Sequence, residues 1–348
     1  MERYAAEITQ RLDDLVDPVV ESVYLVVPTG TFHDFAFRNI RVIETGRLIG
    51  GNLGGYLWEQ IWFARFLLSH KADGYLPLNF VPVLKPDVVV TIHDGNALSH
   101  PEFYPTVRKR LYRVLASVLL RVARRRSSRI LTVSHASRDE LVDRCNFNAS
   151  YVAVAPPGVD HITEDASRTA MNVPEPFYLA LSSATYNKNF EWVLETAVAN
   201  PNQTFLIAGK GDFDAILKSH GYHAPPANVR HLGYVSDEQR NWLYSRCAAF
   251  LFPSRYEGFG LPPLEAACLG APVIVSDIPP MREIFGDGFR YINPDVPATD
   301  LQAVTNCPDV GALRAEFSWT ASAVKILAHL RRTHADKRGA IVHGKLSN

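Results

Sequence analysis

Residues 252–265 read Phe-Pro-Ser-Arg-Tyr-Glu-Gly-Phe-Gly-Leu-Pro-Pro-Leu-Glu and follow the apolar run 248–252. The two glycines let the backbone turn sharply and approach a ligand closely, because glycine has no side chain to obstruct it. The two prolines suit the first positions of a helix. The stretch therefore predicts a buried strand, a glycine turn and a helix beginning near Leu261, which is a local unit of a parallel α/β sheet.

The same turn has the properties of a ligand cradle. The amides from Phe259 to Leu261 lie at the start of the predicted helix, where unpaired N–H groups and the positive end of the helix dipole favour a phosphate. Glu257 and Glu265 would repel a phosphate, but carboxylates accept hydrogen bonds from the hydroxyls of a sugar or ribose. These features indicate a nucleotide sugar. The alternative is that both glutamates are solvated acids near a helix start.

Short apolar runs alternate with helical patterns along the chain, which is typical of parallel sheets covered by helices on both faces. The 348 residues, with 47% hydrophobic content, suffice for two cores. We expect two doubly wound α/β domains with ligands at the carboxyl ends of their strands. The apolar runs are 23–27, 40–43, 88–92, 130–133, 177–181, 204–208, 248–252 and 272–275.

A polar, proline-bearing segment separates the two halves of the chain. Residues 158–176 lack apolar periodicity, so we interpret them as a linker between a first domain, 1–157, and a second domain, 177–318. Residues 319–335 contain apolar side chains at helical spacing and predict a C-terminal helix. Residues 336–348 are polar and are expected to form a frayed tail.

The two glutamates, with seven residues between them, resemble the signature of the group 1 (family 4) retaining glycosyltransferases. The resemblance extends over most of the chain. Within this family, the chain resembles bacterial mannosyltransferase-like enzymes of polysaccharide and O-antigen synthesis. It implies the GT-B fold, in which two Rossmann-like domains face each other across a cleft and the C-terminal helix crosses back toward the first domain. The other resembling segments are 58–60, 91–94, 132–137, 232–236 and 276–284.

The resemblance implies transfer of a hexose, with mannose as one candidate, from a nucleoside-diphosphate sugar to a saccharide or lipid-linked saccharide. Glu265 is then expected to hold the ribose and Glu257 the donor sugar. Charge stabilisation of the leaving group supplies the catalysis, without a covalent nucleophile. The expected backbone contacts to the sugar and diphosphate come from Gly258, Phe259, Gly260 and Leu261.

Lys188 lies in a loop between a predicted strand and a predicted helix, and it is our candidate for stabilising the departing phosphate. Ser183, in the same loop, can add a hydroxyl and an amide to the donor site. Many relatives carry an arginine where this chain has Ser182, so neutralisation of the phosphates is expected to depend more on Lys188. The alternative for Lys188 is an ordinary surface lysine near a helix start.

Two further residues are candidates chiefly through the resemblance. His93 ends the run 88–92 at the carboxyl edge of the first sheet, where it can hydrogen-bond the transferred sugar; a satisfied strand-end histidine is the alternative. Val235 follows Gly233 and is expected to border the base. Ser236, next in the chain, predicts a capping box with Gln239.

Composition excludes several classes of function. The 36 basic and 36 acidic residues cancel, so no global field favours nucleic acid. The 4 cysteines are widely spaced and suggest neither a zinc site nor a disulfide framework. No metal or other cofactor is expected, although Asp212 and Asp214 superficially form an acid pair. With no signal peptide or membrane span in the sequence, we expect a cytoplasmic protein.

Residues 108–129 form a basic amphipathic pattern, with nine Arg or Lys and no acidic residue. Such a helix can dock on anionic lipid, which predicts a peripheral location at the inner face of the cytoplasmic membrane and a lipid-linked acceptor. An ordinary solvated helix face is the alternative.

The chain opens with an Arg3-Tyr4 pair that, in the resembling family, follows a first strand and a glycine-rich loop. Neither precedes the pair here, so we expect either a start that lies upstream or the loss of one edge of the first domain. This anomaly and Ser182 favour a second hypothesis, a catalytically silent binding subunit of the same fold. A nucleotide-sugar epimerase of the GT-B fold is a third.

Overall fold

The computed structural model divides the chain into two compact units, which are described separately below. Unit 1 comprises Met1–Pro157 and Trp319–Asn348, and unit 2 comprises Gly158–Ser318. For residues 2, 52, 53, 56 and 332–343 the backbone alone is described. The structure describes residues 2–17, 19, 22–30, 36–47, 52–72, 74–77, 83–85, 88–126, 129–162, 171–181, 186–209, 212–287, 289–298, 300–301 and 309–343.

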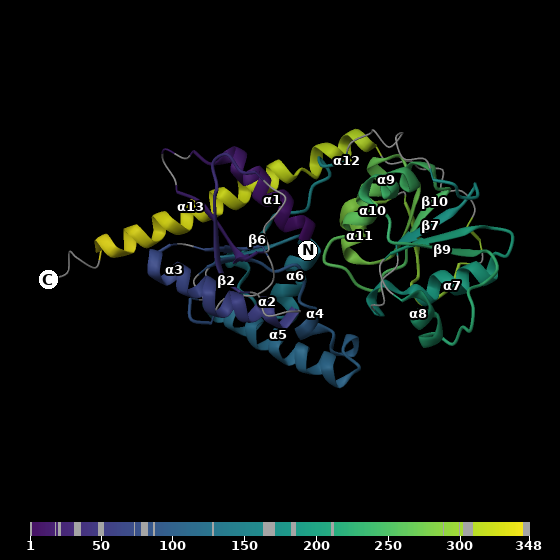
Figure 1. Cartoon of the computed structure of the whole chain (residues 1–348), viewed down its shortest axis with the longest axis horizontal. Helices are drawn as coiled ribbons and strands as arrows, with labels where there is room; N and C mark the ends of the chain where they lie inside the picture. The colour runs from purple at the N-terminus through teal and green to yellow at the C-terminus, as the bar shows by residue number, and fades with distance from the viewer. Residues whose placement is uncertain are drawn as a thin grey trace. The chain divides into compact units, whose positions relative to one another are not determined.

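Unit 2 is built on a six-stranded parallel sheet in the order β12-β11-β10-β7-β8-β9. The inner strands are apolar and buried along their length, as expected for a sheet with helices on both faces. Figure 1 shows this sheet in green between two helix layers. The strands are β7 (Tyr178–Leu181), β8 (Phe205–Ala208), β9 (Val229–Gly233), β10 (Ala249–Phe252), β11 (Val273–Ser276) and β12 (Arg290–Ile292).

Two helix layers cover this sheet. Residues of α7 (Phe190–Ala199) and α8 (Phe213–Ser219) pack with the strands in one core cluster. On the other face, α10 (Leu261–Cys268) contacts β10 and β11. The other helices in the described part of unit 2 are η6 (Tyr186–Lys188), α9 (Asp237–Arg246), α11 (Pro279–Phe285) and α12 (Val310–Glu316).

Unit 1 contains two parallel sheets. The larger one has the order β3-β4-β5-β6, and a separate pair joins β1 to β2. The strands of the larger sheet are short, with two or three residues each. The strands of the pair are β1 (Tyr24–Thr29) and β2 (Arg41–Arg47), and those of the larger sheet are β3 (Tyr75–Leu76), β4 (Val89–Thr91), β5 (Ile130–Thr132) and β6 (Val152–Val154).

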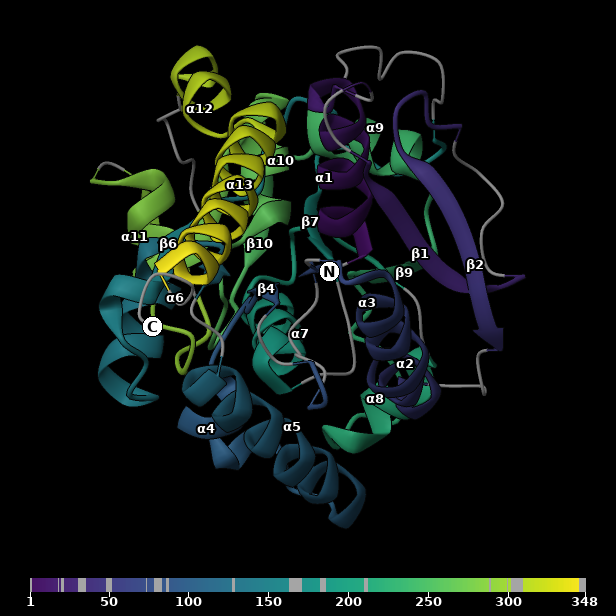
Figure 2. The ribbon, with the colours of Figure 1, turned by 90° about the vertical axis from the view of Figure 1, so that its left-hand side faces the viewer.

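The core of unit 1 joins this sheet to helices η1 (Glu59–Phe63), α3 (Ala64–His70) and α5 (Val107–Arg126). Helices α1 (Glu2–Leu15) and α13 (Trp319–His343) contact each other, although they lie at opposite ends of the chain; Figure 2 shows both above the larger sheet. The shorter helices are α2 (Asn52–Trp58), α4 (Asn96–Ser99), η2 (Pro101–Phe103), α6 (His135–Asp139), η3 (Glu140–Arg144) and η4 (Ala149–Tyr151).

The structure differs from the sequence-based boundaries in two places. Val159 is fully buried and Gly158–Ile162 belongs to unit 2, so this part of the predicted linker is packed protein. The C-terminal helix was expected to end near residue 335, but α13 continues to His343. Polar sequence alone does not end a helix, since neither glycine caps nor prolines interrupt residues 332–338. No helix of the described residues is long and apolar enough to cross a bilayer.

Candidate functional site

The strand order of unit 2 contains one point where the chain reverses its direction of travel across the sheet. From β7 the chain moves to β8 on one side, whereas β10 pairs on the other side of β7. In open α/β sheets the crevice beyond the carboxyl ends of such strands is the usual ligand site. A small pocket lies there. Its lining residues are Ala180, Leu181, Lys188, Phe190, Val193, Leu251, Phe252, Pro253 and Ser254.

Lys188 and Glu257 come together at this point. Lys188 ends η6, which follows β7, and Glu257 lies in the loop after β10. Lys188 Nζ donates a hydrogen bond to Glu257 Oε1 at 2.6 Å, and the ammonium also lies 5.2 Å from the centre of the Phe252 ring. Both side chains remain partly exposed, at 29% and 13%. The sequence predicted both residues for the donor site, and the structure pairs them directly.

Asn189 holds the Lys188 loop against the end of β10. Its side-chain Nδ2 donates to the carbonyl of Pro253 at 3.0 Å and to the carbonyl of Pro294 at 2.7 Å. Asn189 adopts a left-handed backbone conformation (φ 53°), which asparagine tolerates better than most residues. The loop that carries Lys188 is thereby fixed to the loop that leads to Glu257.

The start of α10 confirms the predicted glycine turn and helix. Gly260 has φ +134°, a backbone conformation that favours glycine, and a Cβ there would lie 2.1 Å from the end of the Met281 side chain, which would have to move. No side chain caps the helix, and Pro262 and Pro263 carry no N–H. The amides of Phe259, Gly260 and Leu261 are therefore the ones that α10 can present to an anion.

Glu265 has a different set of partners. Its side chain is 3% exposed, and Oε1 lies 2.9 Å from Nε2 of His161. Oε2 lies 3.6 Å from Nε of Arg240, and Nη1 of the same arginine donates to Asp237 Oδ1 at 2.7 Å. A buried carboxylate needs such partners to offset its loss of hydration. Each carboxylate oxygen has a second lone pair, so Glu265 keeps acceptor capacity for hydroxyl donors.

The two chain segments at the boundary of unit 2 also contact the motif. Val159 N donates to the Phe317 carbonyl at 3.0 Å, which joins the first and last residues of the unit. Phe317 packs edge-to-face on Phe259, with ring centres 5.5 Å apart. Since His161 lies two residues after Val159, the boundary segments and the glycine motif form one packed cluster within unit 2.

The remaining predicted donor residues fall in two groups. Val235 follows β9 and immediately precedes Ser236, whose capping box with Gln239 is present as predicted. Ser183 and its neighbour Ser182 lie outside the described residues.

Asp212 caps α8 by accepting a hydrogen bond from Ala215 N at 3.0 Å, which gives it a structural role.

His93 lies in unit 1, two residues after the end of β4. Its ring Nε2 lies 2.8 Å from the carbonyl of Pro77, so Nε2 carries the proton and donates it. Burial lowers the pKa of His93 to about 4, and the hydrogen bond to Pro77 opposes this shift. The imidazole is therefore neutral at neutral pH. The Tyr4 ring lies edge-on to it, with centroids 4.9 Å apart, and burial raises the pKa of Tyr4 to about 12.

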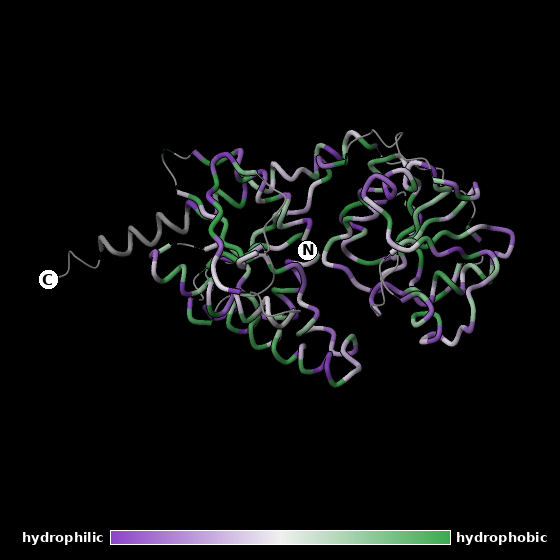
Figure 3. The backbone as a smooth tube through the Cα atoms, viewed as in Figure 1, coloured by the Kyte–Doolittle hydropathy of each residue, from purple (hydrophilic) through white to green (hydrophobic). Residues whose placement is uncertain are grey.

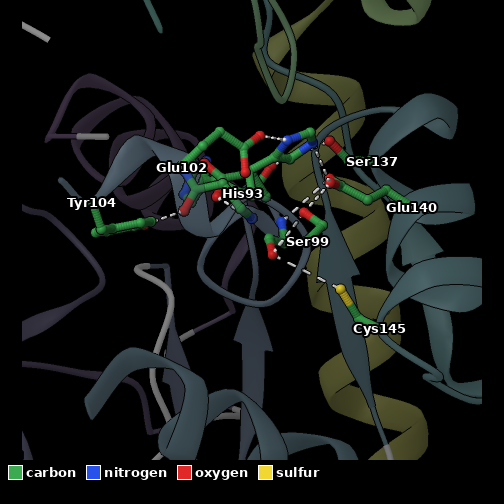
Figure 4. A network of polar contacts seen from close by, with 11 residues as sticks. His93, Ser99, Glu102, Tyr104, Ser137, Glu140 and Cys145 are labelled. Atoms are coloured by element: carbon green, nitrogen blue, oxygen red, sulfur yellow. Dashed lines mark hydrogen bonds and ion pairs between the residues drawn. The ribbon is translucent and has the colours of Figure 1, made fainter. Parts of the chain in front are cut away.

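A polar network fixes the loop that follows His93 (Figure 4). Ser137 Oγ donates to the His93 carbonyl at 3.2 Å. Glu140 accepts from Ser99 Oγ at 2.5 Å and from Gly95 N at 3.4 Å, and Cys145 Sγ contacts the Gly95 carbonyl. These contacts fix the backbone of the loop, and they thereby fix the position of His93.

Sequence reasoning missed His161, Arg240 and Tyr4. None of them has a local pattern that marks a site, because their partners lie far away in the chain: 104 residues separate His161 from Glu265, and Tyr4 hydroxyl donates to Ala155 carbonyl across 151 residues. The sequence offered one indication of a role for His161, namely that this histidine stands in a segment interpreted as a solvated linker.

Comparisons with known proteins give the family. A model described as Glycosyltransferase Family 4 matches residues 1–162, and one described as Glycosyl transferases group 1 matches residues 162–303. The chain is 26% identical over 229 residues to the O-antigen chain mannosyltransferase RfbU of Salmonella typhimurium, covering 65% of this chain and 62% of that protein. The chain thus spans less than two thirds of that relative. It is 28% identical over 297 residues to O-antigen chain mannosyltransferase B of Escherichia coli, covering 79% of this chain and 73% of that protein.

A solved structure gives the fold. Sucrose-phosphate synthase from Thermosynechococcus elongatus superposes with a TM-score of 0.67 at 18% identity, covering 96% of this chain and 93% of that one. At this identity the likeness concerns the fold alone. Since the two family models together match residues 1–303, the chain belongs to the group 1 (family 4) glycosyltransferases and has their GT-B fold.

Proposed function

We propose that the protein is a retaining hexosyltransferase that takes its sugar from a nucleoside-diphosphate donor. The observation that carries this proposal is the Lys188–Glu257 pair at the reversal point of the unit 2 sheet. There the Lys188 ammonium can bind a phosphate, and the neighbouring Glu257 carboxylate can accept hydrogen bonds from sugar hydroxyls. Both groups lie next to the start of α10, which no side chain caps. In the absence of donor the two groups neutralise each other.

Donor binding then exchanges one set of contacts for another. Lys188 transfers from Glu257 to the diphosphate, and Glu257 becomes an acceptor for the hydroxyls of the sugar. The amides from Gly258 to Leu261 contact the sugar and diphosphate, and Glu265 accepts from the ribose hydroxyls. Val235 and Ser183 complete the donor set, at the base and the phosphates.

Catalysis rests on electrostatic stabilisation of the leaving group. As the C1–O bond of the donor breaks, the acceptor hydroxyl oxygen bonds to C1 on the same face and its proton passes to the departing diphosphate. Negative charge grows on the diphosphate in this step, where Lys188 and the α10 amides stabilise it. These groups supply the positive charge that a metal ion supplies in other enzymes, so we propose transfer that needs no metal. His93, neutral and fixed by Pro77, is proposed to hydrogen-bond the transferred sugar.

Mannose is the first sugar to test, because two similar proteins are named O-antigen chain mannosyltransferases. The same names support a saccharide or lipid-linked saccharide as acceptor. We propose a cytoplasmic location at the inner face of the membrane, with α5 as the contact to the lipid surface. No role in binding nucleic acid is proposed.

A silent binding subunit is the second candidate, favoured by Ser182, which stands where the family resemblance leads us to expect an arginine. The two candidates differ in turnover. A subunit binds the nucleotide but releases no nucleoside diphosphate, whereas a transferase releases it in proportion to acceptor. An epimerase converts the donor sugar without any acceptor.

The experiment begins with saturation-transfer NMR of the purified chain against UDP, GDP, ADP and their sugar conjugates, repeated with Glu265→Ala. We expect one base to bind and the signal to fall in the variant. Acceptor-dependent release of that nucleoside diphosphate is then measured in the presence of a chelator, and the anomeric configuration of the product is read by NMR.

Two substitutions test the catalytic pair against a matched control. Lys188→Met and Glu257→Gln should each lower kcat about 100-fold or more, the usual loss for one oxyanion or leaving-group contact. Lys218→Met, an exposed lysine at the end of α8, should leave transfer unchanged. Full activity in both site variants, or an inverted product, would falsify the proposed mechanism.

A further inference from the structure

Tyr4, in α1, joins several parts of unit 1 at one buried point. The residue is only 3% exposed. Its ring lies edge-on to the ring of His93, with centroids 4.9 Å apart, and edge-on to the ring of Trp319, with centroids 5.5 Å apart. Both distances are in the range where edge-to-face aromatic pairs attract each other. Tyr4 is therefore a link between His93 and the first residue of α13.

The hydroxyl group of Tyr4 determines where this ring lies. It donates a hydrogen bond to the Ala155 carbonyl at 3.2 Å, and the side chains of Thr91 and Tyr75 also hydrogen-bond it. Thr91 is the last residue of β4, and Ala155 directly follows β6. The ring is thus held at the carboxyl ends of two strands by contacts that do not involve His93.

The sequence of α1 explains why Tyr4 points inward. Tyr4, Ile8 and Leu12 recur at a spacing of four residues, so they lie on one face of the helix, and all three are buried. Figure 3 shows hydrophobic and hydrophilic residues alternating along this helix. Since α1 contacts α13, the position of Tyr4 depends on how these two helices pack.

The chain passes between the two units close to the contacts of Tyr4. It leaves unit 1 two residues after Ala155 and returns to unit 1 at Trp319. Ser322 Oγ donates to the Pro156 carbonyl at 2.6 Å, which joins the leaving and the returning segment within unit 1. Tyr4 contacts both segments, the first through its hydroxyl and the second through its ring.

Within unit 2 the returning segment contacts the glycine motif. The rings of Phe317 and Phe259 pack edge-to-face, and one residue separates Phe317 from Trp319 in the chain. A series of contacts therefore runs from Phe259 to Phe317, along the backbone to Trp319, and through Tyr4 to His93. A continuous series does not by itself establish energetic coupling, which is measured as non-additivity between substitutions.

We propose that Tyr4 is a positioning residue for His93 and makes the orientation of the His93 ring depend on Trp319. The Pro77 carbonyl holds one atom of the imidazole, Nε2, and the Tyr4 ring sets the plane of the imidazole. A shift of Trp319 then moves Tyr4 and turns the imidazole. The importance of this link for sugar transfer rests on the proposed role of His93, but the link itself does not.

The first test follows His93 by NMR in the full chain with ¹³C-labelled histidine, and His93→Gln identifies its Cε1–H signal. Burial lowers the pKa of His93 to about 4. Tyr4→Leu admits water beside the ring, so this pKa should rise toward its ordinary value of 6.5. Tyr4→Phe keeps an aromatic ring at the same place and should restore most of the difference.

A matched control separates this effect from a general loss of stability. Leu12→Ala removes a buried side chain two turns further along the same helix, where it should destabilise the protein without changing the pKa of His93. Tyr4→Met fills more of the space than Tyr4→Leu, and it replaces that variant if Tyr4→Leu does not fold.

A double-mutant cycle tests the link to Trp319. Trp319→Phe keeps a buried ring but changes its outline, so it should displace the His93 signal. In the Tyr4→Leu background the same substitution should displace the signal much less, because the ring that connects the two residues is gone.

The transfer assay gives a separate readout of function. Tyr4→Leu should lower kcat about tenfold and leave the donor KM unchanged, because the donor contacts lie in unit 2. If the unmodified chain transfers no sugar, the proposed function fails, whereas the NMR tests of Tyr4 keep their meaning.

Three results would overturn the proposal. The first is an unchanged His93 pKa in the folded Tyr4→Leu variant, and the second is an equal rise of that pKa in Leu12→Ala. The third is an equal displacement of the His93 signal by Trp319→Phe in the presence and absence of the Tyr4 ring.

Discussion

His161 Nε2 and Glu265 Oε1 lie 2.9 Å apart, although 104 residues separate them in the chain. His161 belongs to the first residues of unit 2, and Glu265 lies in α10, the helix that follows the glycine motif. Both side chains are almost completely buried, at 7% and 3% exposure. The contact therefore fixes the carboxylate that we propose as the ribose acceptor, from a segment at the start of unit 2 that lies far from α10 in the sequence.

The first prediction concerns this contact. His161→Leu removes the hydrogen-bond donor to Glu265 Oε1 and leaves Glu265 with Arg240 as its charged partner. The carboxylate should therefore lose its fixed orientation. We expect nucleoside-diphosphate affinity to fall about tenfold, the usual worth of one hydrogen bond to a charged group. His161→Gln offers an amide donor at similar reach and should restore most of the affinity. Isothermal titration measures both, and equal affinity of the two variants would show that His161 only fills space.

The second prediction concerns the Lys188–Glu257 pair. A double-mutant cycle with Lys188→Met and Glu257→Gln, read by urea unfolding, should give a coupling free energy of about 1 kcal/mol or less, because both side chains are partly exposed to water. With saturating nucleoside diphosphate the coupling should disappear, since Lys188 then binds the phosphates. A coupling that persists unchanged in the saturated protein would mean that Lys188 never leaves Glu257.

The third prediction compares two glycines at the two ends of α10. Gly260→Ala meets both a strained backbone (φ +134°) and the Met281 side chain, whereas Gly270→Ala meets strain alone (φ +82°) and open space. Backbone strain of this kind costs about 1–3 kcal/mol. Gly260→Ala should therefore destabilise the protein more than Gly270→Ala does, and Met281→Ala should recover part of the difference. Thermal unfolding of Gly260→Ala, Gly270→Ala, Met281→Ala and the double variant Gly260→Ala with Met281→Ala checks the order, and equal losses at both glycines contradict it.

Local pattern was enough to predict much of unit 2. The apolar runs placed β7, β8, β10 and β11 within a residue or two, and the glycines and prolines placed the start of α10 at Leu261. The short strands β3, β6 and β12 were missed, because two or three residues carry too little pattern and take their conformation from neighbouring strands.

Some residues of the candidate site could likewise be predicted from local sequence, and others could not. Lys188 was predicted from its loop between a strand and a helix, and Glu257 from the glycine turn that it borders and from the family resemblance. The partners of Glu265 were not, because a pairing across 104 residues leaves no trace in local sequence. The fit of Gly260 against Met281 was likewise hidden, although the glycine itself was assigned to a turn.

The last prediction concerns Glu59, a carboxyl group in unit 1 on the π-helical segment η1. Its Oε2 atom is buried without a hydrogen-bond partner in the described structure, and burial raises the pKa of Glu59 to about 8. The folded protein thus keeps a proton that the unfolded chain releases above its ordinary pKa of 4.5. The stability that this proton contributes is complete below that value and is lost as the pH rises through about 8.

Glu59→Gln replaces the protonated acid by a neutral side chain of the same shape, so its stability should not follow this titration. The unmodified protein should therefore lose stability relative to Glu59→Gln by on the order of 3 kcal/mol between pH about 6 and pH about 9. Urea unfolding across this range measures the difference, in which the titrations of other groups cancel. Glu316→Gln, at an exposed glutamate of α12, is the matched control and should run parallel to the unmodified protein at every pH. A pH-independent difference between the Glu59 variant and the unmodified protein would mean that Glu59 ionises normally, with water or a ligand at its buried oxygen.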